Sequence, residues 1–266
     1  MLHLQKEHDI IAFSTERGFV DMDEPYQGFN ITWYTDDDAQ HVADCRRDMC
    51  QMLEIDDQHL VLPRQVHDTK VAEVTAGNLG DRFEGIDALI TTLPRTCIGV
   101  STADCVPILM YDARTRAIAA AHAGWRGTVA RIGRKTIEAM QQQYGTKPED
   151  LKIVIGPSIG PDAFEVGDEV YEAFAQADFD MNRIAFKRNG KWHIDLWQAN
   201  ALDMQLTGVD EKHIETAAVC TYEHYDQFFS ARRLGIKSGK RKRKWLFFTL
   251  FFLDFGYYSY FCNMMI

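Results

Sequence analysis

The sequence predicts a single mixed α/β domain, and three observations support this fold class. Short apolar runs of strand length alternate with segments of helical periodicity through the middle of the chain. No Pro- or Ser-rich linker and no internal repeat divides the chain. The length of 266 residues, 46% of them hydrophobic, suffices to bury one sizeable core. Strands and helices that alternate around one core favour an α/β architecture.

In the first half of the chain, strands are expected where short apolar runs stand between turn residues. These runs cover residues 10–14, 60–66, 88–92, 97–101, 106–111 and 118–122. One helix is expected at 42–53, where Val42, Met49 and Leu53 are the apolar positions.

After Thr128 the apolar spacing changes to that of a helix, with Thr128 as the expected N-cap and Gly145 as the stop. The apolar positions of this helix are Val129, Ile132, Ile137, Met140 and Tyr144. The remaining runs predict strands at 151–155 and 216–220 and helices at 168–177 and 195–206.

Residues 240–266 differ in composition from the rest of the chain. A dense basic cluster is followed by an aromatic run without clear helical or strand periodicity. Its unbroken apolar part before Asp254 is about nine residues long, against roughly 20 needed to span a bilayer. We therefore expect a domain over residues 1–239 and an atypical C-terminal tail over 240–266. For the tail, a poorly ordered or non-native segment is favoured over a packed strand or helix, and a membrane anchor ranks last.

Charge and cysteine content limit the function classes. The net charge of −10, from 39 acidic and 29 basic residues, argues against non-specific binding of nucleic acid and favours a small-molecule substrate. The N-terminus lacks a secretory signal, which predicts a cytoplasmic protein with no membrane partner. The six cysteines are expected to stay reduced. A functional cysteine is then expected to be catalytic or metal-binding.

Cys105 and His122 are the first candidates for a site, because they border two strands of a predicted hairpin. If the loop is centred between Ala113 and Arg114, Cys105 stands directly opposite His122, with Cβ atoms about 4.5–5.5 Å apart on one face. A register shift of one residue would separate the two side chains. The pair leaves two chemistries open. One is a cysteine nucleophile with a histidine base. The other is a catalytic zinc site that needs a third protein ligand.

The third ligand is sought among the nine histidines. His67 is the first choice because it ends the apolar run in LPRQVHD, and His193 in KWHIDLW is the second. Asp104, immediately before Cys105, is expected to orient an imidazole or to cap a turn.

Two further stretches suggest anion or nucleoside binding. GWRG at 124–127 leads into a predicted helix, whose start favours an anion, and Arg126 offers a guanidinium fork. FFSARR at 228–233 suits a nucleoside or phosphate site and equally a solvated strand end. GPSIG at 156–160 is neither a Walker loop nor a dinucleotide fingerprint.

The order of the motifs supplies a resemblance that covers about residues 10 to 239. The motifs are QVH at 65–67, ADCVPIL at 103–109, HAGWRG at 122–127, GPSIG at 156–160, HIDLW at 193–197, and CT with FFSARR at 220–233. This combination resembles the laccase-domain proteins, also called multicopper polyphenol oxidases or purine nucleoside phosphorylases. The resemblance implies two mixed sheets packed face to face and flanked by helices. One departure is Lys240, which follows SG where the family usually has an arginine and a short final strand.

The resemblance also implies a site and an activity. His67, Cys105 and His122 match the family's metal ligands and catalytic residues, with zinc as the expected metal and copper as the alternative. Arg46 matches a family arginine, and we expect Arg46, Arg126, Ser230 and Arg233 to contact the substrate. The implied reaction splits adenosine, inosine, guanosine or methylthioadenosine with phosphate into base and ribose 1-phosphate, with adenosine deamination as a second activity. The expected partners are purine nucleosides and phosphate, and the expected state is a monomer or homodimer.

Three alternatives stay open at this point. Copper-dependent phenol oxidation ranks lower, because one cysteine and two histidines are too few ligands for a multicopper cluster. A metal-independent Cys-His amidase that edits peptidoglycan precursors would use the same residues. A structural zinc domain would normally close the ion with four protein ligands, and the sequence offers three good candidates.

Overall fold

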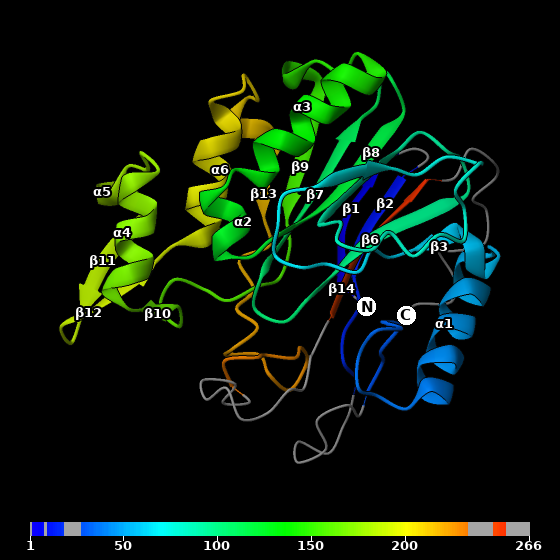
Figure 1. Ribbon diagram of the computed structural model, residues 1–266, viewed down its shortest axis with the longest axis horizontal. Helices are drawn as coiled ribbons and strands as arrows, with labels where there is room; N and C mark the ends of the chain where they lie inside the picture. The colour runs from blue at the N-terminus through cyan, green and yellow to red at the C-terminus, as the bar shows by residue number, and fades with distance from the viewer. Residues whose placement is uncertain (1, 8–9, 19–27, 234–246, 254–266) are drawn as a thin grey trace.

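Two mixed β-sheets pack face to face between helices, as Figure 1 shows for this computed structural model. The structure describes residues 2–7, 10–18, 28–233 and 247–253. One hydrophobic cluster lies between the two sheets, and one lies between each sheet and the helices that cover its outer face. The predicted α/β class and the implied sandwich of two sheets are therefore confirmed. Among the described residues, no helix combines the length and apolar character needed to cross a bilayer.

The six-stranded sheet carries most of the core. Its strands, in spatial order, are β13 (Ile214–Thr216), β9 (Leu151–Ile155), β7 (Val106–Asp112), β8 (Ala117–Ala123), β5 (Ala88–Thr91) and β4 (Val71–Glu73). Every residue of β5, β7 and β8 is buried. One face packs on helices α3 (Ile132–Tyr144) and α6 (Leu196–Gln205). Strands covered on both faces are uniformly apolar, which is why they were predictable from short apolar runs.

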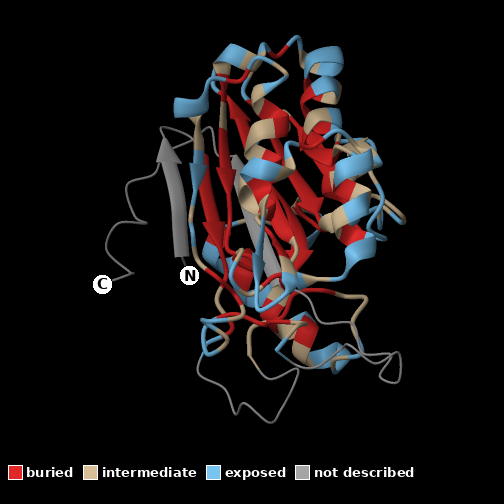
Figure 2. Cartoon of the chain, turned by 90° about the vertical axis from the view of Figure 1, so that its left-hand side faces the viewer, coloured by how far each residue is buried: buried red, intermediate tan, exposed pale blue. Residues whose placement is uncertain are grey.

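The five-stranded sheet lies behind the first. Its order is β1 (Leu2–Glu7), β2 (Ile10–Ser14), β14 (Phe247–Leu253), β6 (Thr96–Thr102) and β3 (Leu60–Val61). Leu89, Leu109 and Ile118 of the six-stranded sheet meet Ile98 and Val100 of β6 between the two sheets. Figure 2 shows the buried strands enclosed between partly exposed helices.

Strand β14 changes the expectation for the C-terminal tail. Residues 247–253 pair antiparallel with β2 on one side and with β6 on the other. Alternation of apolar and polar residues marks strands with one exposed face, so its absence from the sequence did not exclude a strand here. The rest of the tail, 240–246 and 254–266, lies outside the described residues.

Helix α1 (Ala39–Leu53) covers the outer face of the five-stranded sheet. It begins at the N-cap Asp38, whose carboxylate accepts the N–H groups of Gln40 and His41. Met49 and Leu53 pack in the same buried cluster as strand residues of this sheet. The helix predicted at 42–53 is confirmed, with one additional turn at its start.

A smaller unit extends from the main sandwich. It holds a three-stranded sheet of β10 (Glu165–Val166), β12 (Lys191–Ile194) and β11 (Ala185–Arg188), together with α4 (Asp168–Gln176) and α5 (Met181–Ile184). Short 3-10 turns η1 (Asp57–His59), η2 (Pro148–Asp150) and η3 (Glu211–His213) precede β3, β9 and β13. The sequence predicted α4 but none of these three strands, because two to four residues are too few to show a period.

Three predicted boundaries were wrong. The strand expected at 60–66 ends at Val61, and the strand expected at 216–220 lies at Ile214–Thr216. The helix expected to start at the Thr128 N-cap is two helices, of which α2 (Trp125–Val129) begins after Gly124. Arg131 separates α2 from α3 because its left-handed backbone, with φ of 66°, interrupts the helical path.

Candidate metal centre

The chain passes twice from the five-stranded sheet to the six-stranded sheet near one point. The first crossing joins β3 to β4 and carries His67, and the second joins β6 to β7 and carries Cys105. His122 is the penultimate residue of β8, next to β7. Each sheet crossing therefore contributes one candidate ligand, and the hairpin contributes the third.

The three side chains converge as the sequence predicted. The potential ligand atoms of His67, Cys105 and His122 all lie within 4.8 Å of one another. Cys105 Sγ is 3.8 Å from His67 Nε2, and the two imidazole rings are 4.7 Å apart between centroids. His67 is exposed, Cys105 is half-buried and His122 is buried, so the group is open to solvent at His67.

The donor set fits a zinc ion. One sulfur and two imidazole nitrogens are ordinary zinc ligands, and three protein ligands leave one position for a water or substrate. In the described part of the chain, this is the one group of three or more metal-binding side chains. A closed structural site with four protein ligands is not formed by these residues.

The predicted hairpin register was wrong by two residues. His122 is paired with Pro107, and Asp112 with Ala117 at the turn. Cys105 comes just before β7 and so lies diagonal to His122, not opposite it. A shift of two residues keeps side chains on the same face, which is why the two ligands still converge.

Gly124 provides the space in which the sulfur and the first imidazole meet. A Cβ at this position would lie 3.0 Å from Cys105 Sγ and 3.0 Å from His67 Cδ2. Gly124 is therefore needed so that the Cys105 and His67 side chains can approach the backbone, and not because its φ is positive.

Gln65 fixes the start of the first crossing against the end of β6. Its side-chain amide accepts the N–H of Ser101 at 2.7 Å and donates to the carbonyl of Ser101 at 2.7 Å. The Tyr34 hydroxyl donates to the same Gln65 oxygen at 3.3 Å. The Gln65 side chain thus pairs with Ser101 as the backbone of a neighbouring strand would, and it fixes the chain two residues before His67.

Asp87, which the sequence analysis missed, binds both histidine segments. This fully buried carboxylate accepts the N–H groups of Val66, His67 and Asp68 at 3.1, 2.9 and 3.0 Å. Its Oδ1 is also 2.9 Å from Nδ1 of His122. A signal was available, because an acidic residue that precedes a buried apolar strand must find several donors.

The electrostatics favour a charged pair in the absence of metal. Burial raises the pKa of Cys105, but the His122 and His67 imidazoles outweigh this effect and lower the pKa to about 6. Burial lowers the pKa of His122, whereas Cys105 and Asp87 together raise it to about 9. A thiolate beside an imidazolium is therefore the preferred state at neutral pH.

Asp104 connects the Cys105 segment to the FFSARR stretch. Its buried carboxylate accepts the Thr221 hydroxyl at 2.8 Å and the Arg232 N–H at 2.6 Å. Burial raises the pKa of Asp104. Of the two predicted roles, holding a turn agrees with these contacts. Ser230 is buried and its hydroxyl accepts the N–H of Arg233 at 3.1 Å.

The predicted arginines occupy different surroundings. Arg233 is exposed and lies 4.2 Å from the ring centroid of Tyr225. Arg126 is exposed and stacks 4.2 Å above the ring of Trp125. It lies inside the five-residue helix α2, and not before a helix that starts at Thr128, as the sequence predicted.

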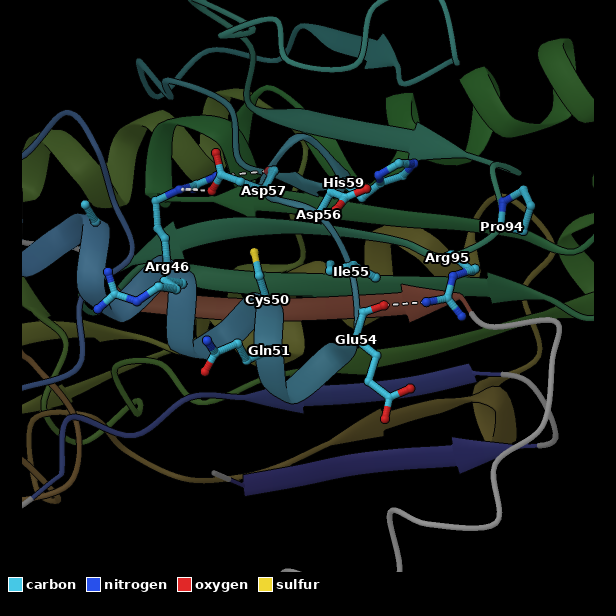
Figure 3. A pocket seen from close by; sticks show the side chains of 12 residues that line it. Arg46, Cys50, Gln51, Glu54, Ile55, Asp56, Asp57, His59, Pro94 and Arg95 are labelled. Carbon is cyan, nitrogen blue, oxygen red and sulfur yellow. Dashed lines mark hydrogen bonds and ion pairs between the residues drawn. The ribbon is translucent and has the colours of Figure 1, made fainter.

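Arg46 is held by α1 and its neighbours. Its guanidinium donates to Asp57 at 2.8 Å and to the Leu60 carbonyl at 3.0 Å. It lines two adjoining surface cavities of about 860 and 540 Å³, and Figure 3 shows the larger one along α1. None of the three candidate ligands is among the described residues that line these cavities.

His193, the second choice for a third ligand, is not in the group. It lies in β12, with Nδ1 3.1 Å from the Pro161 carbonyl oxygen and its ring stacked on Phe186. The choice of His67 agrees with the geometry.

Comparison with known proteins places the chain in a family. A family model described as multi-copper polyphenol oxidoreductase laccase matches residues 10–243. The chain belongs to this family. It is 48% identical over 227 residues to a purine nucleoside phosphorylase of Bacteroides thetaiotaomicron, covering 81% of this chain and 83% of the relative. It is 44% identical over 238 residues to adenosine deaminase RL5 of an unknown prokaryotic organism, covering 86% and 90%.

Solved structures of the family have the same fold. The hypothetical protein YfiH of Bacillus licheniformis superposes with a TM-score of 0.83 at 25% identity, covering 92% of this chain and 93% of the other. Protein NMB0706 of Neisseria meningitidis gives a TM-score of 0.80 at 28% identity, covering 95% and 98%. The fold implied by the motif resemblance is thus confirmed independently of the activity.

Proposed function

We propose that this protein is a zinc-dependent purine nucleoside phosphorylase with adenosine deaminase activity. The observation that carries the proposal is the convergence of His67, Cys105 and His122 at a solvent-accessible point. Two family members that are 48% and 44% identical bear the names of these two activities. Three ligands with one free position suit catalysis better than a structural ion.

Each of the two reactions exchanges one bond of the nucleoside for another. In phosphorolysis, a phosphate oxygen forms a bond to the ribose C1′ while the C1′–N bond breaks, and the departing purine takes the electron pair and a proton. In deamination, water replaces the amino group of adenosine and ammonia leaves. A zinc ion held by His67, Cys105 and His122 would supply Lewis acidity to both reactions. Asp87 and Gln65 hold the ligand segments, and Arg46, Arg126, Ser230 and Arg233 are the proposed substrate contacts.

A nucleoside assay tests this function. Zinc-loaded protein is incubated with inosine and phosphate, and hypoxanthine and ribose 1-phosphate are measured by chromatography. We expect hypoxanthine release that depends on phosphate, and ammonia release from adenosine without phosphate. Lack of both products from protein with one zinc per chain would overturn the proposal. Cys105→Ser serves as the inactive control, with its fold verified by circular dichroism.

Further measurements separate the alternatives. A copper-dependent phenol oxidase would consume dioxygen with a phenol when it is loaded with copper, and the proposal expects no such uptake. A Cys-His amidase acting on peptidoglycan precursors would keep its activity after full chelation, whereas the proposed reactions require the metal. Elemental analysis of the purified protein identifies zinc or copper directly.

Location and assembly complete the proposal. We infer a cytoplasmic protein that acts as a monomer or homodimer on free nucleosides and phosphate, without nucleic acid. Light scattering during size-exclusion chromatography measures the assembly state, and cell fractionation measures the location.

A further inference from the structure

Asp87 contacts two of the three candidate ligands through different groups. Its carboxylate receives three consecutive backbone N–H groups of the first crossing, including that of His67. The same carboxylate meets Nδ1 of His122. The Asp87 carbonyl also accepts the backbone N–H of His122 at 2.8 Å. One buried residue, immediately before β5, thereby joins segments that are far apart in the sequence.

We propose that Asp87 is the positioning residue of the metal centre. It determines which ring nitrogen His122 offers to the metal, and it fixes the backbone from which His67 projects. This inference rests on the metal-dependent function proposed above, but it concerns metal binding and not turnover.

The argument for His122 follows from the hydrogen-bonding capacity of a carboxylate. An ionised carboxylate can only accept, so its partner on the ring must be a protonated Nδ1. When a metal displaces the other proton of the His122 imidazolium, the lone pair is on Nε2, the ring nitrogen that is not bonded to Asp87. A carboxylate behind a metal-binding histidine is a common means of fixing this tautomer.

The argument for His67 follows from its backbone. His67 has φ of 64°, in the left-handed region that residues other than glycine adopt at an energetic cost. Three N–H groups from Val66, His67 and Asp68 on one carboxylate stabilise this turn. Without them the imidazole of His67, which is exposed, would lose its fixed direction.

The substitution Asp87→Asn separates acceptor geometry from size. The amide has nearly the same shape, but one of its two positions carries a donor. If the NH₂ group takes the Oδ2 position, it faces the N–H groups of Val66 and Asp68. If it takes the Oδ1 position, it faces His67 N–H and forces His122 to accept through Nδ1, which leaves the proton on Nε2. Either arrangement disturbs at least one candidate ligand.

Asp112 provides a matched control. It is also fully buried, it accepts two backbone N–H groups, from Arg114 and Thr115, and it lies at the opposite end of the β7–β8 hairpin. Asp112→Asn removes a similar buried negative charge without touching any candidate ligand, and its amide oxygen can keep both backbone N–H groups, which bind the same Oδ1. An effect of losing a buried charge would appear in both variants, whereas a positioning role affects only Asp87→Asn.

The experiment measures zinc binding and local backbone protection of the full-length protein. Zinc affinity is determined by competition with a chromophoric chelator, and amide hydrogen exchange is followed at residues 66–68 in the metal-free state. We expect Asp87→Asn to bind zinc 10–100-fold more weakly than the wild type and to lose protection at 66–68. We expect Asp112→Asn to match the wild type in both measurements.

Three outcomes decide against the inference. Wild-type affinity in folded Asp87→Asn overturns it, as does an equal loss in both variants. If Asp87→Asn does not fold, ¹⁵N NMR of zinc-loaded wild-type protein decides: Nδ1 of His122 must carry the proton, and zinc on Nδ1 overturns the inference. A wild-type protein that binds no zinc overturns the metal-dependent function as well, which distinguishes that failure from a failure of the Asp87 role alone.

Discussion

Gly124 is the residue whose replacement most directly tests the packing of the ligand group. Because a Cβ would lie 3.0 Å from both Cys105 Sγ and His67 Cδ2, Gly124→Ala must displace one ligand. Strain of this kind costs about 1–3 kcal/mol, which predicts zinc affinity weaker by about 5- to 150-fold. Titration with a competing chelator measures it. Gly77→Ala is the control, since its Cβ would meet only Thr75 Oγ1 at 3.8 Å, and equal affinities of the two variants would contradict the prediction.

The thiol of Cys105 provides a prediction about pH. In metal-free protein its pKa is lowered to about 6, so the thiolate dominates above this pH and is protonated below it. Burial raises the pKa of Cys45, and burial raises that of Cys50 to about 11, so both remain thiols at neutral pH. We expect iodoacetamide to label Cys105 first at pH 7.5, with a rate that falls as the pH decreases through about 6.

Peptide mass spectrometry measures this labelling at each cysteine. Zinc should suppress it at Cys105, and His122→Gln should move the midpoint towards that of an ordinary thiol. A Cys105 labelling rate that is the same at pH 5 and pH 8 would show that no low-pKa thiolate is present.

At the residue scale, the sequence predicted the three candidate ligands that converge in the structure, but not the residues that hold them in place. Cys105, His122 and His67 carry recognisable motifs and stand beside apolar strands, so pattern and resemblance both led to them. Asp87 acts through hydrogen bonds to Val66–Asp68, and Gln65 through hydrogen bonds to Ser101. In both cases the partners are distant in the sequence and only the fold brings them together. No local pattern encodes such partners, although the burial of an acidic residue in GIDALI requires them.

At the element scale, the break between α2 and α3 depends on an ion-pair cluster. Asp203 of α6 is buried and accepts Arg131 Nη1 at 2.8 Å, and it also contacts Arg134 of α3. Hydrogen bonds between charged groups contribute about 1.5–3 kcal/mol each. We therefore expect Asp203→Asn to lower the free energy of unfolding by about 2 kcal/mol, measured by urea denaturation.

An exposed ion pair is the control for this prediction. Asp162 pairs with Arg188 at 2.7 Å on the surface, where such pairs contribute little. Asp162→Asn should change the free energy of unfolding by less than about 0.5 kcal/mol. If both variants lose the same stability, the Asp203 cluster is not a special support for α3 and α6.

Elements were predictable in proportion to their length and burial. The strands at 106–111 and 118–122 are long and apolar, and they were found within one residue at each end. The register between them was misplaced by two residues because the position of the turn, Ala113–Arg116, has no strong glycine or proline signal. The division at Arg131 was missed because a left-handed arginine depends on Asp203, which is more than 70 residues away.

At the scale of the whole molecule, strand β14 determines whether the five-stranded sheet is continuous. It is bonded to β2 on one side and to β6 on the other. A chain that ends after residue 239 would leave both neighbours with unpaired edges, which promote aggregation. We expect this truncated chain to be insoluble or unfolded.

The length of the truncation supplies the control. A chain that ends after residue 253 keeps β14 and should remain soluble, with cooperative unfolding by circular dichroism. Cooperative unfolding of a soluble chain ending after residue 239 would contradict the central position of β14. The sequence alone could not settle this point, because the run lacks the alternation by which strands are usually identified.

The two sheet crossings would give a bound metal a role in holding the layers together. His67 and Cys105 lie on separate links between the sheets, so an ion bound to both, and to His122, ties those links at one point. A ligand that binds only the native state adds about 2.7 kcal/mol of stability when its free concentration is 100 times Kd. Zinc should therefore raise Tm by about 5–10 °C in a thermal scan. Since the site forms only when both links are in place, zinc uptake during refolding reports the docking of one sheet on the other.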